Sequence, residues 1–376
     1  MTFFGKLKIA VLGAAIVSSS VASAQTDWKD RFSVGGDLRY RVQRDLEGRT
    51  NTTTDDWTTQ LRARLNVEAK VNDAITAHLR VGTGEVPQTG YDQMTGASST
   101  KRFGLLLGYL DYKLTDSISF ALGKAPNPFW SAGQSAMVWS PDMNFEGLQA
   151  KWAGDMGDLK PFITLNYATM LDRGGNNTDI NMFGAQIGTS WSMEPLNIGV
   201  AVGMFSYNNM KGLPKDAGLA PHGNSTIKIG EGPTPDPEDD IYGFAHEFNL
   251  MNAGLEVGYD LGFAPITAFV DYVQNSDPSE RNKGMLGGLA LGKLEDVGSW
   301  MVRVSYRDLE QDATLGYFAD PYFLGGGTDV RGTELSGAYM FMANTSVGFT
   351  WNTGVRNASA GEQNYENYYI DFTTTF

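Results

Sequence analysis

The sequence contains no cysteine among its 376 residues. This absence excludes a disulfide-stabilised scaffold and any metal site built on thiolates. Positive charge is also scarce: 29 Lys and Arg stand against 43 Asp and Glu, for a net charge of −14. A general nucleic-acid binder is therefore excluded, because such a protein needs a basic surface. No stretch reaches the roughly 20 apolar residues of a membrane-spanning helix. Hydrophobic residues still make up 41% of the chain, which argues against intrinsic disorder.

The first 24 residues have the pattern of a cleaved secretory signal. Lys6 and Lys8 give the positive start, residues 9–17 the short apolar core, and residues 22–24 (Ala-Ser-Ala) a small-residue cleavage site. The apolar core is too short to cross a membrane as a helix. Cleavage would remove two lysines and no acidic residue, so the net charge would change from −14 to −16. We expect the mature chain, residues 25–376, to be one exported domain.

Apolar and polar residues alternate along most of the mature chain. Leu61, Ala63 and Leu65, for example, alternate with Arg62 and Arg64. Side chains two residues apart lie on the same face of a strand, so the pattern predicts strands with one apolar and one polar face. Sixteen segments are predicted strands: 31–43, 57–71, 74–83, 103–113, 117–124, 144–153, 159–169, 180–193, 195–207, 244–259, 263–275, 284–294, 298–311, 328–342, 344–356 and 364–376.

The connectors between these segments alternate strictly between long and short. Every odd-numbered connector is longer than every even-numbered one, and the longest contains residues 208–243. Such alternation predicts an up-and-down antiparallel sheet with one plain rim and one elaborated rim. No helices remain to cover the apolar faces, so the sheet must close into a barrel, which also removes its unpaired edges.

The strand number decides which face of the barrel is apolar. A sixteen-stranded barrel encloses an aqueous channel, so its inner face must be polar. The apolar face then points outward, which is stable only in a membrane. The last strand fits, since Phe376, Phe372 and Ile370 share one face. Aromatic residues near strand ends suit interfacial girdles, although ordinary core packing would also explain them: Tyr40, Trp57, Tyr112, Trp152, Tyr259, Tyr272 and Trp300. The predicted fold is an all-β transmembrane antiparallel barrel of about 16 strands.

Two segments have a distinctive sequence. One comprises residues 123–130 (GKAPNPFW) and 138–148 (VWSPDMNFEGL), and the other runs from Gly298 to Gly332. Both resemble the bacterial "putative porin" family of outer-membrane β-barrels. The resemblance implies a porin channel in a Gram-negative outer membrane, a homotrimer, and contact with outer-membrane lipid and lipopolysaccharide. It also implies that the barrel-assembly machinery recognises the terminal Phe376. It implies no defined solute.

The polar faces of the strands predict the channel lining. If Leu61 and its alternates face lipid, the expected lumen residues are Arg39, Arg41, Arg62, Arg64, Lys70, His78, Arg80, Arg303 and Arg307. The first seven lie on three consecutive strands and form one basic patch, for which Asp37 and Glu68 are candidate counter-charges. Cross-strand neighbours are only about 5 Å apart, so the arginines would otherwise repel one another. They are either locally neutralised or impose a field that favours anions.

The third long connector, residues 125–143, corresponds to the loop that general porins fold into the barrel as a constriction. Its candidate residues are Pro126, Pro128, Phe129, Trp130, Trp139 and Asp142. This composition is apolar and stiff, as expected of a loop packed against a wall. Asp142 is its only acidic residue, unlike the constriction loops of general diffusion porins. The aromatic residues either anchor the loop or form a path for sugars and other amphipathic solutes.

The chain offers little catalytic or metal-binding chemistry. His246 lacks the second histidine of a zinc helix. His222 and Ser225 raise the alternative of an outer-membrane hydrolase, but no supporting arrangement is evident. The acidic segment 236–240 either binds Ca²⁺ or bridges lipopolysaccharide through divalent ions, or is a solvated loop. We expect no enzyme, no cofactor and no metal site.

The sequence therefore predicts passive diffusion of small hydrophilic solutes, with a preference for anions. A barrel with a mainly structural or adhesive role, acting through residues 208–243, is the main alternative.

Overall fold

The computed structural model describes residues 28–49, 52–84, 90–94, 97–175, 178–234, 236 and 239–376. The predicted signal, residues 1–24, lies outside these residues. None of the helices in the described residues combines the length and apolar character needed to cross a bilayer. The short 3-10 helices are η1 (Trp28–Arg31), η2 (Ala132–Gln134), η4 (Gly316–Phe318) and η5 (Phe323–Gly325).

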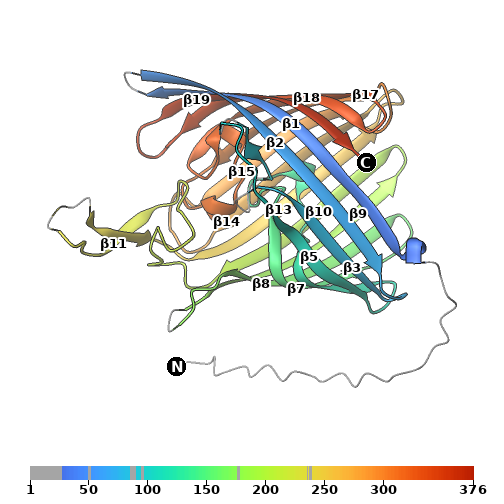
Figure 1. Ribbon diagram of the computed structural model, residues 1–376, viewed down its shortest axis with the longest axis horizontal. Helices are drawn as coiled ribbons and strands as arrows, with labels where there is room; N and C mark the ends of the chain where they lie inside the picture. The colour runs from blue at the N-terminus through green and yellow to red at the C-terminus, as the bar shows by residue number, and fades with distance from the viewer. Residues whose placement is uncertain are drawn as a thin grey trace.

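The strands form one closed antiparallel barrel (Figure 1). Each strand pairs with its neighbour in the chain, and the last strand pairs with the first. The barrel strands are β1 (Phe32–Arg49), β2 (Thr52–Lys70), β3 (Ile75–Thr83), β5 (Phe103–Lys113), β6 (Ile118–Pro126), β7 (Asn144–Ala153), β8 (Leu159–Leu171), β9 (Ile180–Met193), β10 (Leu196–Tyr207), β13 (Phe248–Asp260), β14 (Pro265–Asn275), β15 (Lys283–Gly292), β16 (Trp300–Leu309), β17 (Val330–Met342), β18 (Thr345–Arg356) and β19 (Gln363–Thr375). These are the sixteen strands that the alternation predicts. A two-residue strand, β4 (Asp92–Gln93), adds to β2, and β11 (Thr226–Gly230) pairs with β12 (Ile241–Phe244) as a separate hairpin.

The two rims of the barrel differ, as predicted. One rim carries the long connectors 84–102, 127–143, 208–247 and 310–329, and the β11–β12 hairpin projects from it (Figure 1). The other rim carries tight turns, such as 343–344, and both the start of β1 and the C-terminus. Long loops mark the extracellular side of outer-membrane barrels and short turns the periplasmic side.

The prediction that residues 44–56 form the first connector is wrong. β1 and β2 pair from Arg49 and Thr52 downward, so residues 44–49 and 52–56 are strand (Figure 1). The hairpin extends beyond β3, whose pairing with β2 ends at Arg64, whereas β19 pairs with β1 up to Gly48. Its acidic and threonine-rich composition is typical of a loop. Cross-strand contacts stabilise it instead, because Arg44 forms two hydrogen bonds with Asp55 and covers the ring of Trp57. The strict alternation of connector lengths fails at this position for the same reason.

The alternation of faces is otherwise as the sequence predicts on the first strands. Val34, Leu38 and Leu65 are exposed on the outer surface, whereas Arg41 and Arg62 are buried. At the seam, Phe376 exchanges two backbone hydrogen bonds with Gly36. A Cβ atom at Gly36 would lie 2.6 Å from the Phe376 ring, so this position suits glycine.

The interior of the barrel contains an apolar core, which the sequence does not predict. Inward-facing residues of β10, β13, β14 and β15 are buried and apolar, including Phe205, Phe248, Phe269, Val273 and Leu286. They pack against apolar residues of the loops 127–143 and 310–329, among them Met137, Trp139, Phe318 and Phe323. The inner face is polar on β1, β2 and β3 but apolar where these loops cover it from water.

Candidate functional site: the arginine wall and the inner loops

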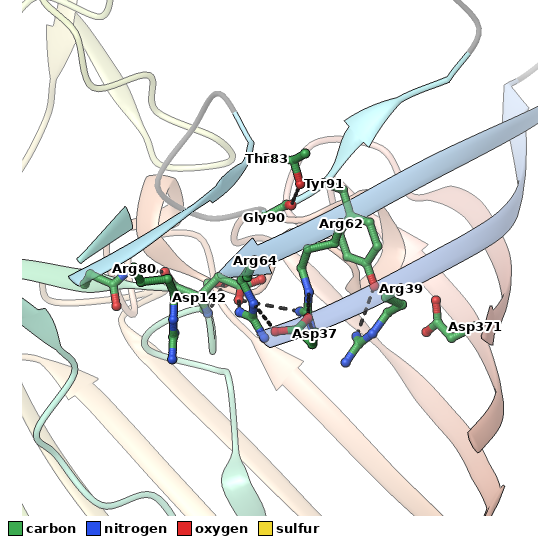
Figure 2. Close-up of polar contacts among 12 residues, drawn as sticks. Asp37, Arg39, Arg62, Arg64, Arg80, Thr83, Gly90, Tyr91, Asp142 and Asp371 are labelled. Atoms are coloured by element: carbon green, nitrogen blue, oxygen red, sulfur yellow. Dashed lines mark hydrogen bonds and ion pairs between the residues drawn. The ribbon is translucent and has the colours of Figure 1, made fainter. Parts of the chain in front are cut away.

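Four charged residues join the inner faces of β1 and β2 to the loop 127–143 (Figure 2). Arg64 Nε lies 2.7 Å from Asp37 Oδ2, and Arg64 Nη1 lies 3.0 Å from Asp142 Oδ1. Arg62 Nη2 contacts the other oxygen of Asp37 at 3.0 Å. Asp37 therefore neutralises part of the basic patch, as the sequence predicts, and Asp142 attaches the end of the loop to Arg62 and Arg64.

Arg41 occupies an aromatic cage at the seam of the barrel. Its Nε and Nη2 atoms each lie 2.8 Å from an oxygen of Asp371. The guanidinium carbon lies 4.5, 4.6 and 4.4 Å from the ring centres of Tyr91, Tyr322 and Tyr369. A guanidinium attracts the faces of aromatic rings. Because Tyr91 and Tyr322 come from the loops 84–102 and 310–329, Arg41 holds both loops inside the barrel.

Arg39 and Arg80 have no ion pair within the part of the chain that the structure describes. Arg39 Nη1 donates to the Tyr91 hydroxyl at 3.0 Å, and Arg80 Nε donates to Asn66. Arg39 lies opposite Arg62 across the β1–β2 pair, and Arg80 lies opposite Asn66 across the β2–β3 pair. From β1 to β3 these arginines lie progressively closer to the short-turn rim. We call the set Arg39, Arg41, Arg62, Arg64 and Arg80 the arginine staircase.

The remaining predicted members of the patch lie lower on the same strands. His78 stacks on Tyr109 with ring centres 4.5 Å apart, and its Nδ1 lies 3.5 Å from Glu68. Lys70 is exposed at the end of β2, opposite Thr76.

Arg303 and Arg307 belong to a separate, charge-balanced cluster on β16. Arg307 Nη2 lies 3.0 Å from Asp320 Oδ2, and Arg303 Nε lies 3.7 Å from Glu334 Oε1. Arg303 also donates to the backbone carbonyl of Gly133. These arginines hold the inner loops in place and do not extend the patch on β1–β3.

Side chains of the barrel wall fix the loop 127–143 along its length. Gln186 accepts from the backbone N–H of Trp130 and donates to its carbonyl, both at 2.8 Å. Glu256 accepts from Gly133 N at 2.7 Å. Gln149 donates to the carbonyl of Pro126 at 2.8 Å, and Pro128 is half-buried beside Phe129.

Aromatic packing completes this attachment. Phe129 and Trp139 stack with ring centres 5.2 Å apart, and both contact Phe205. The indole N–H of Trp139 donates to the buried Tyr207 hydroxyl at 2.9 Å. Both Phe129 and Trp139 are buried, so they pack the loop against the wall and do not present their rings to a passing solute.

Comparisons with known proteins agree with this architecture. Residues 43–376 match the family described as "Putative porin". The chain belongs to this family. No curated protein matches the sequence.

Solved outer-membrane structures resemble the barrel at low sequence identity. The high-pH structure of Pseudomonas putida OprB has a TM-score of 0.59 at 10% identity and covers 93% of this chain and 95% of its own. Salmonella typhi OmpF in complex with daunomycin has a TM-score of 0.54 at 11% identity, with coverage of 92% and 97%. A mutant of Rh. blastica porin has a TM-score of 0.51 at 10% identity, with coverage of 92% and 100%. These likenesses show the fold. Family and fold together support an outer-membrane channel.

In the part of the chain that the structure describes, His222 and Ser225 have different partners. Ser225 Oγ donates to Asp312 Oδ2 at 2.6 Å, and the ring of His222 packs beside Tyr317. No hydrogen bond joins His222 to Ser225 among the described residues. A serine nucleophile needs a base within hydrogen-bond reach, so these residues form a structural contact between the loops 208–247 and 310–329.

The acidic segment 236–240 is described only in part, since Glu238 lies outside the described residues. Asp240 pairs with Lys228 at 2.8 Å. Across the portion of the porin that is described, no group of three or more histidine or acidic side chains lies close enough to hold a metal ion.

Several partners of Arg41 could not be found from the sequence. Tyr91 and Tyr322 lie in loops without periodicity, and Asp371 lies 330 positions from its partner Arg41. Asp371 has the inward parity of the last strand, which is the one signal that sequence reasoning could have used.

Proposed function

We propose that this porin mediates passive diffusion of small hydrophilic solutes and prefers anions. The anion preference rests on the charge balance of the arginine staircase on β1–β3. It contains five arginines, and three carboxylates, Asp37, Asp142 and Asp371, form ion pairs with them. Arg39 and Arg80 leave an excess of positive charge on this wall. A channel lined by one sign of charge raises the local concentration of the opposite ion.

The inner loops would set the width of the channel. The loop 127–143 packs on the side of the lumen formed by β8–β10 and β13–β16, where the apolar core lies, and the loop 310–329 extends from that side to β18 and β19. The open path would run beside the staircase, between Arg39, Arg64 and Arg80. The net charge of the whole chain is a poor guide here, because many acidic residues lie in exposed loops.

The experiment is a planar-bilayer measurement with the full-length porin under a salt gradient. We expect discrete conductance steps and a reversal potential of the sign that anion permeation gives. A reversal potential of the opposite sign would contradict the anion preference, and absence of any conductance would contradict the channel itself.

Two associated expectations remain proposals of the same kind. A homotrimer is supported by the porin family alone, and crosslinking in native membranes tests it.

Recognition by the barrel-assembly machinery is supported by the exposed aromatic end, since the Phe376 side chain is 69% exposed on the outer surface. Replacement of Phe376 by serine should lower the yield of folded barrel in cells.

A structural or adhesive role is the second candidate. The β11–β12 hairpin projects from the long-loop rim (Figure 1). The side chains of Ile227, Ile229 and Ile241 on it are exposed. Deletion of the hairpin should leave conductance unchanged if this role is separate from transport.

A further inference from the structure

The lipid-facing wall carries an apolar groove that the channel does not use. A cavity of about 530 Å³ opens on β8, β9, β10, β13 and β14, and its lining is almost entirely apolar on the outer surface. Met204 and Met251 on its border are 64% and 58% exposed. These side chains therefore face the membrane.

The strand register explains why a groove forms here. Ala185 lies opposite Met204 on the β9–β10 pair, and Ala253 lies opposite Tyr272 on the β13–β14 pair. Met204 and Met251 face each other between these pairs. Short alanine side chains next to long neighbours leave a hollow that the outer wall does not fill.

The groove lies in the half of the membrane nearest the long-loop rim. Met204 and Met251 are close to the ends of β10 and β13 that adjoin the loop 208–247. Long loops mark the extracellular side of such barrels. The lipid next to the groove is therefore a lipid of the outer leaflet, which in a Gram-negative outer membrane is lipopolysaccharide.

Polar side chains form a row at the extracellular end of the groove. Ser206 donates to its cross-strand partner Asn249 at 2.5 Å. The Tyr272 hydroxyl donates to Gln274 Oε1 at 3.0 Å, which leaves the amide N–H groups of Gln274 directed elsewhere. Lys283 lies directly opposite Gln274 on β15 and is exposed. The backbone N–H of Lys283 donates to Glu310 Oε2. The side-chain ammonium of Lys283 has no ion pair within the described residues.

We propose that the groove and this polar row bind one lipopolysaccharide molecule. An acyl chain would occupy the hollow at Ala185 and Ala253, and a lipid A phosphate would accept hydrogen bonds from Lys283 and Gln274. Inside a bilayer the acyl chain is surrounded by apolar groups whether or not it is bound. Its favourable binding free energy therefore comes from close packing in the hollow. The charge-assisted contacts at the head group supply the selectivity.

Native mass spectrometry of the full-length porin in detergent micelles tests this proposal. The folded porin is titrated with lipid A and, separately, with phosphatidylethanolamine. We expect one lipid A molecule to remain bound at concentrations where phosphatidylethanolamine does not. Equal retention of both lipids would overturn the assignment to lipopolysaccharide, because the polar row would then have no selective role.

Substitutions localise the site. Ala253→Trp fills the hollow and should weaken lipid A binding at least tenfold, and Ala185→Leu serves if the tryptophan variant does not fold. Ala268→Trp is the matched control, since Ala268 faces outward on β14 but does not line the groove. Lys283→Gln should weaken binding of lipid A without changing that of phosphatidylethanolamine. Unchanged lipid A binding in Ala253→Trp would overturn the proposal. A change in the oligomer mass of that variant would also overturn it, because the groove would then be a contact between subunits.

Discussion

Arg41 and Asp371 join the first and last strands of the barrel. Two parallel contacts of 2.8 Å link their side chains, which are only 7% and 17% exposed. The residues are 330 positions apart, so the pair exists only when the barrel has closed. A bidentate arginine–carboxylate pair is strong and geometrically specific. The pair joins β1 and β19 at the level where the loops 84–102 and 310–329 contact the Arg41 guanidinium.

Asp371→Asn should destabilise the folded barrel by about 3–5 kcal/mol, because it leaves a buried guanidinium without its counter-charge. Urea unfolding in micelles measures the change. Asp55→Asn is the control, since the Arg44–Asp55 pair has similar geometry but side chains that are 35% and 46% exposed. Exposed pairs contribute less than about 1 kcal/mol. Equal effects of the two substitutions would contradict the importance of burial at the seam.

The double substitution Arg39→Gln with Arg80→Gln should lower the anion-to-cation permeability ratio at least about twofold, because both charges face the lumen and neither forms an ion pair with a residue that the structure describes. Reversal potentials under a salt gradient measure the ratio. Arg331→Gln provides the matched control, since Arg331 is exposed and pairs with Glu362 near the long-loop rim. If the control shifts the potential as much as the double variant, the surface charge and not the staircase sets the preference.

Gly133→Val should push the tip of the loop 127–143 away from β14 and into the lumen, and should lower the single-channel conductance. A Cβ atom at Gly133 would lie 2.3 Å from the Phe269 ring, and its φ of 56° disfavours other residues. Gly157→Val controls for backbone strain, which costs roughly 1–2 kcal/mol at such a φ, because Gly157 has φ +74° but no atoms within 4 Å of a Cβ. A conductance equal to that of the wild type in Gly133→Val would show that this loop does not limit the current.

The contact between the loops 208–247 and 310–329 should weaken in acid. Burial, and secondarily the charge of Arg356, lowers the pKa of His222. The detached loop would have the ordinary histidine pKa of about 6.5, so it binds more protons than the docked loop as pH falls below that value. Docking therefore loses stability as pH falls from 7 to 5.

Hydrogen exchange at the Thr328 amide, which donates to the His222 carbonyl at 2.9 Å, should accelerate at pH 5 beyond its intrinsic pH dependence. His222→Asn should abolish the extra acceleration, since asparagine tolerates the φ of 43° at this position. Retention of the effect in this variant would assign it to another group.

The closed barrel and its polar inner wall on β1–β3 follow from the sequence. A period of two residues places Leu61, Ala63 and Leu65 on one face and Arg62 and Arg64 on the other. The number of such segments then requires the apolar face to point outward. Local spacing alone therefore predicts the sixteen strands and the inward arginines.

Local spacing could not predict which side chains meet inside the barrel. The partners of Arg62 and Arg41, Asp142 and Asp371, come from distant segments that closure brings together. The apolar inner wall around Phe205 and Phe269 was also missed, because it depends on two loops that turn inward and exclude water. Alternation determines the face on which a residue lies; only the tertiary structure decides what covers that face.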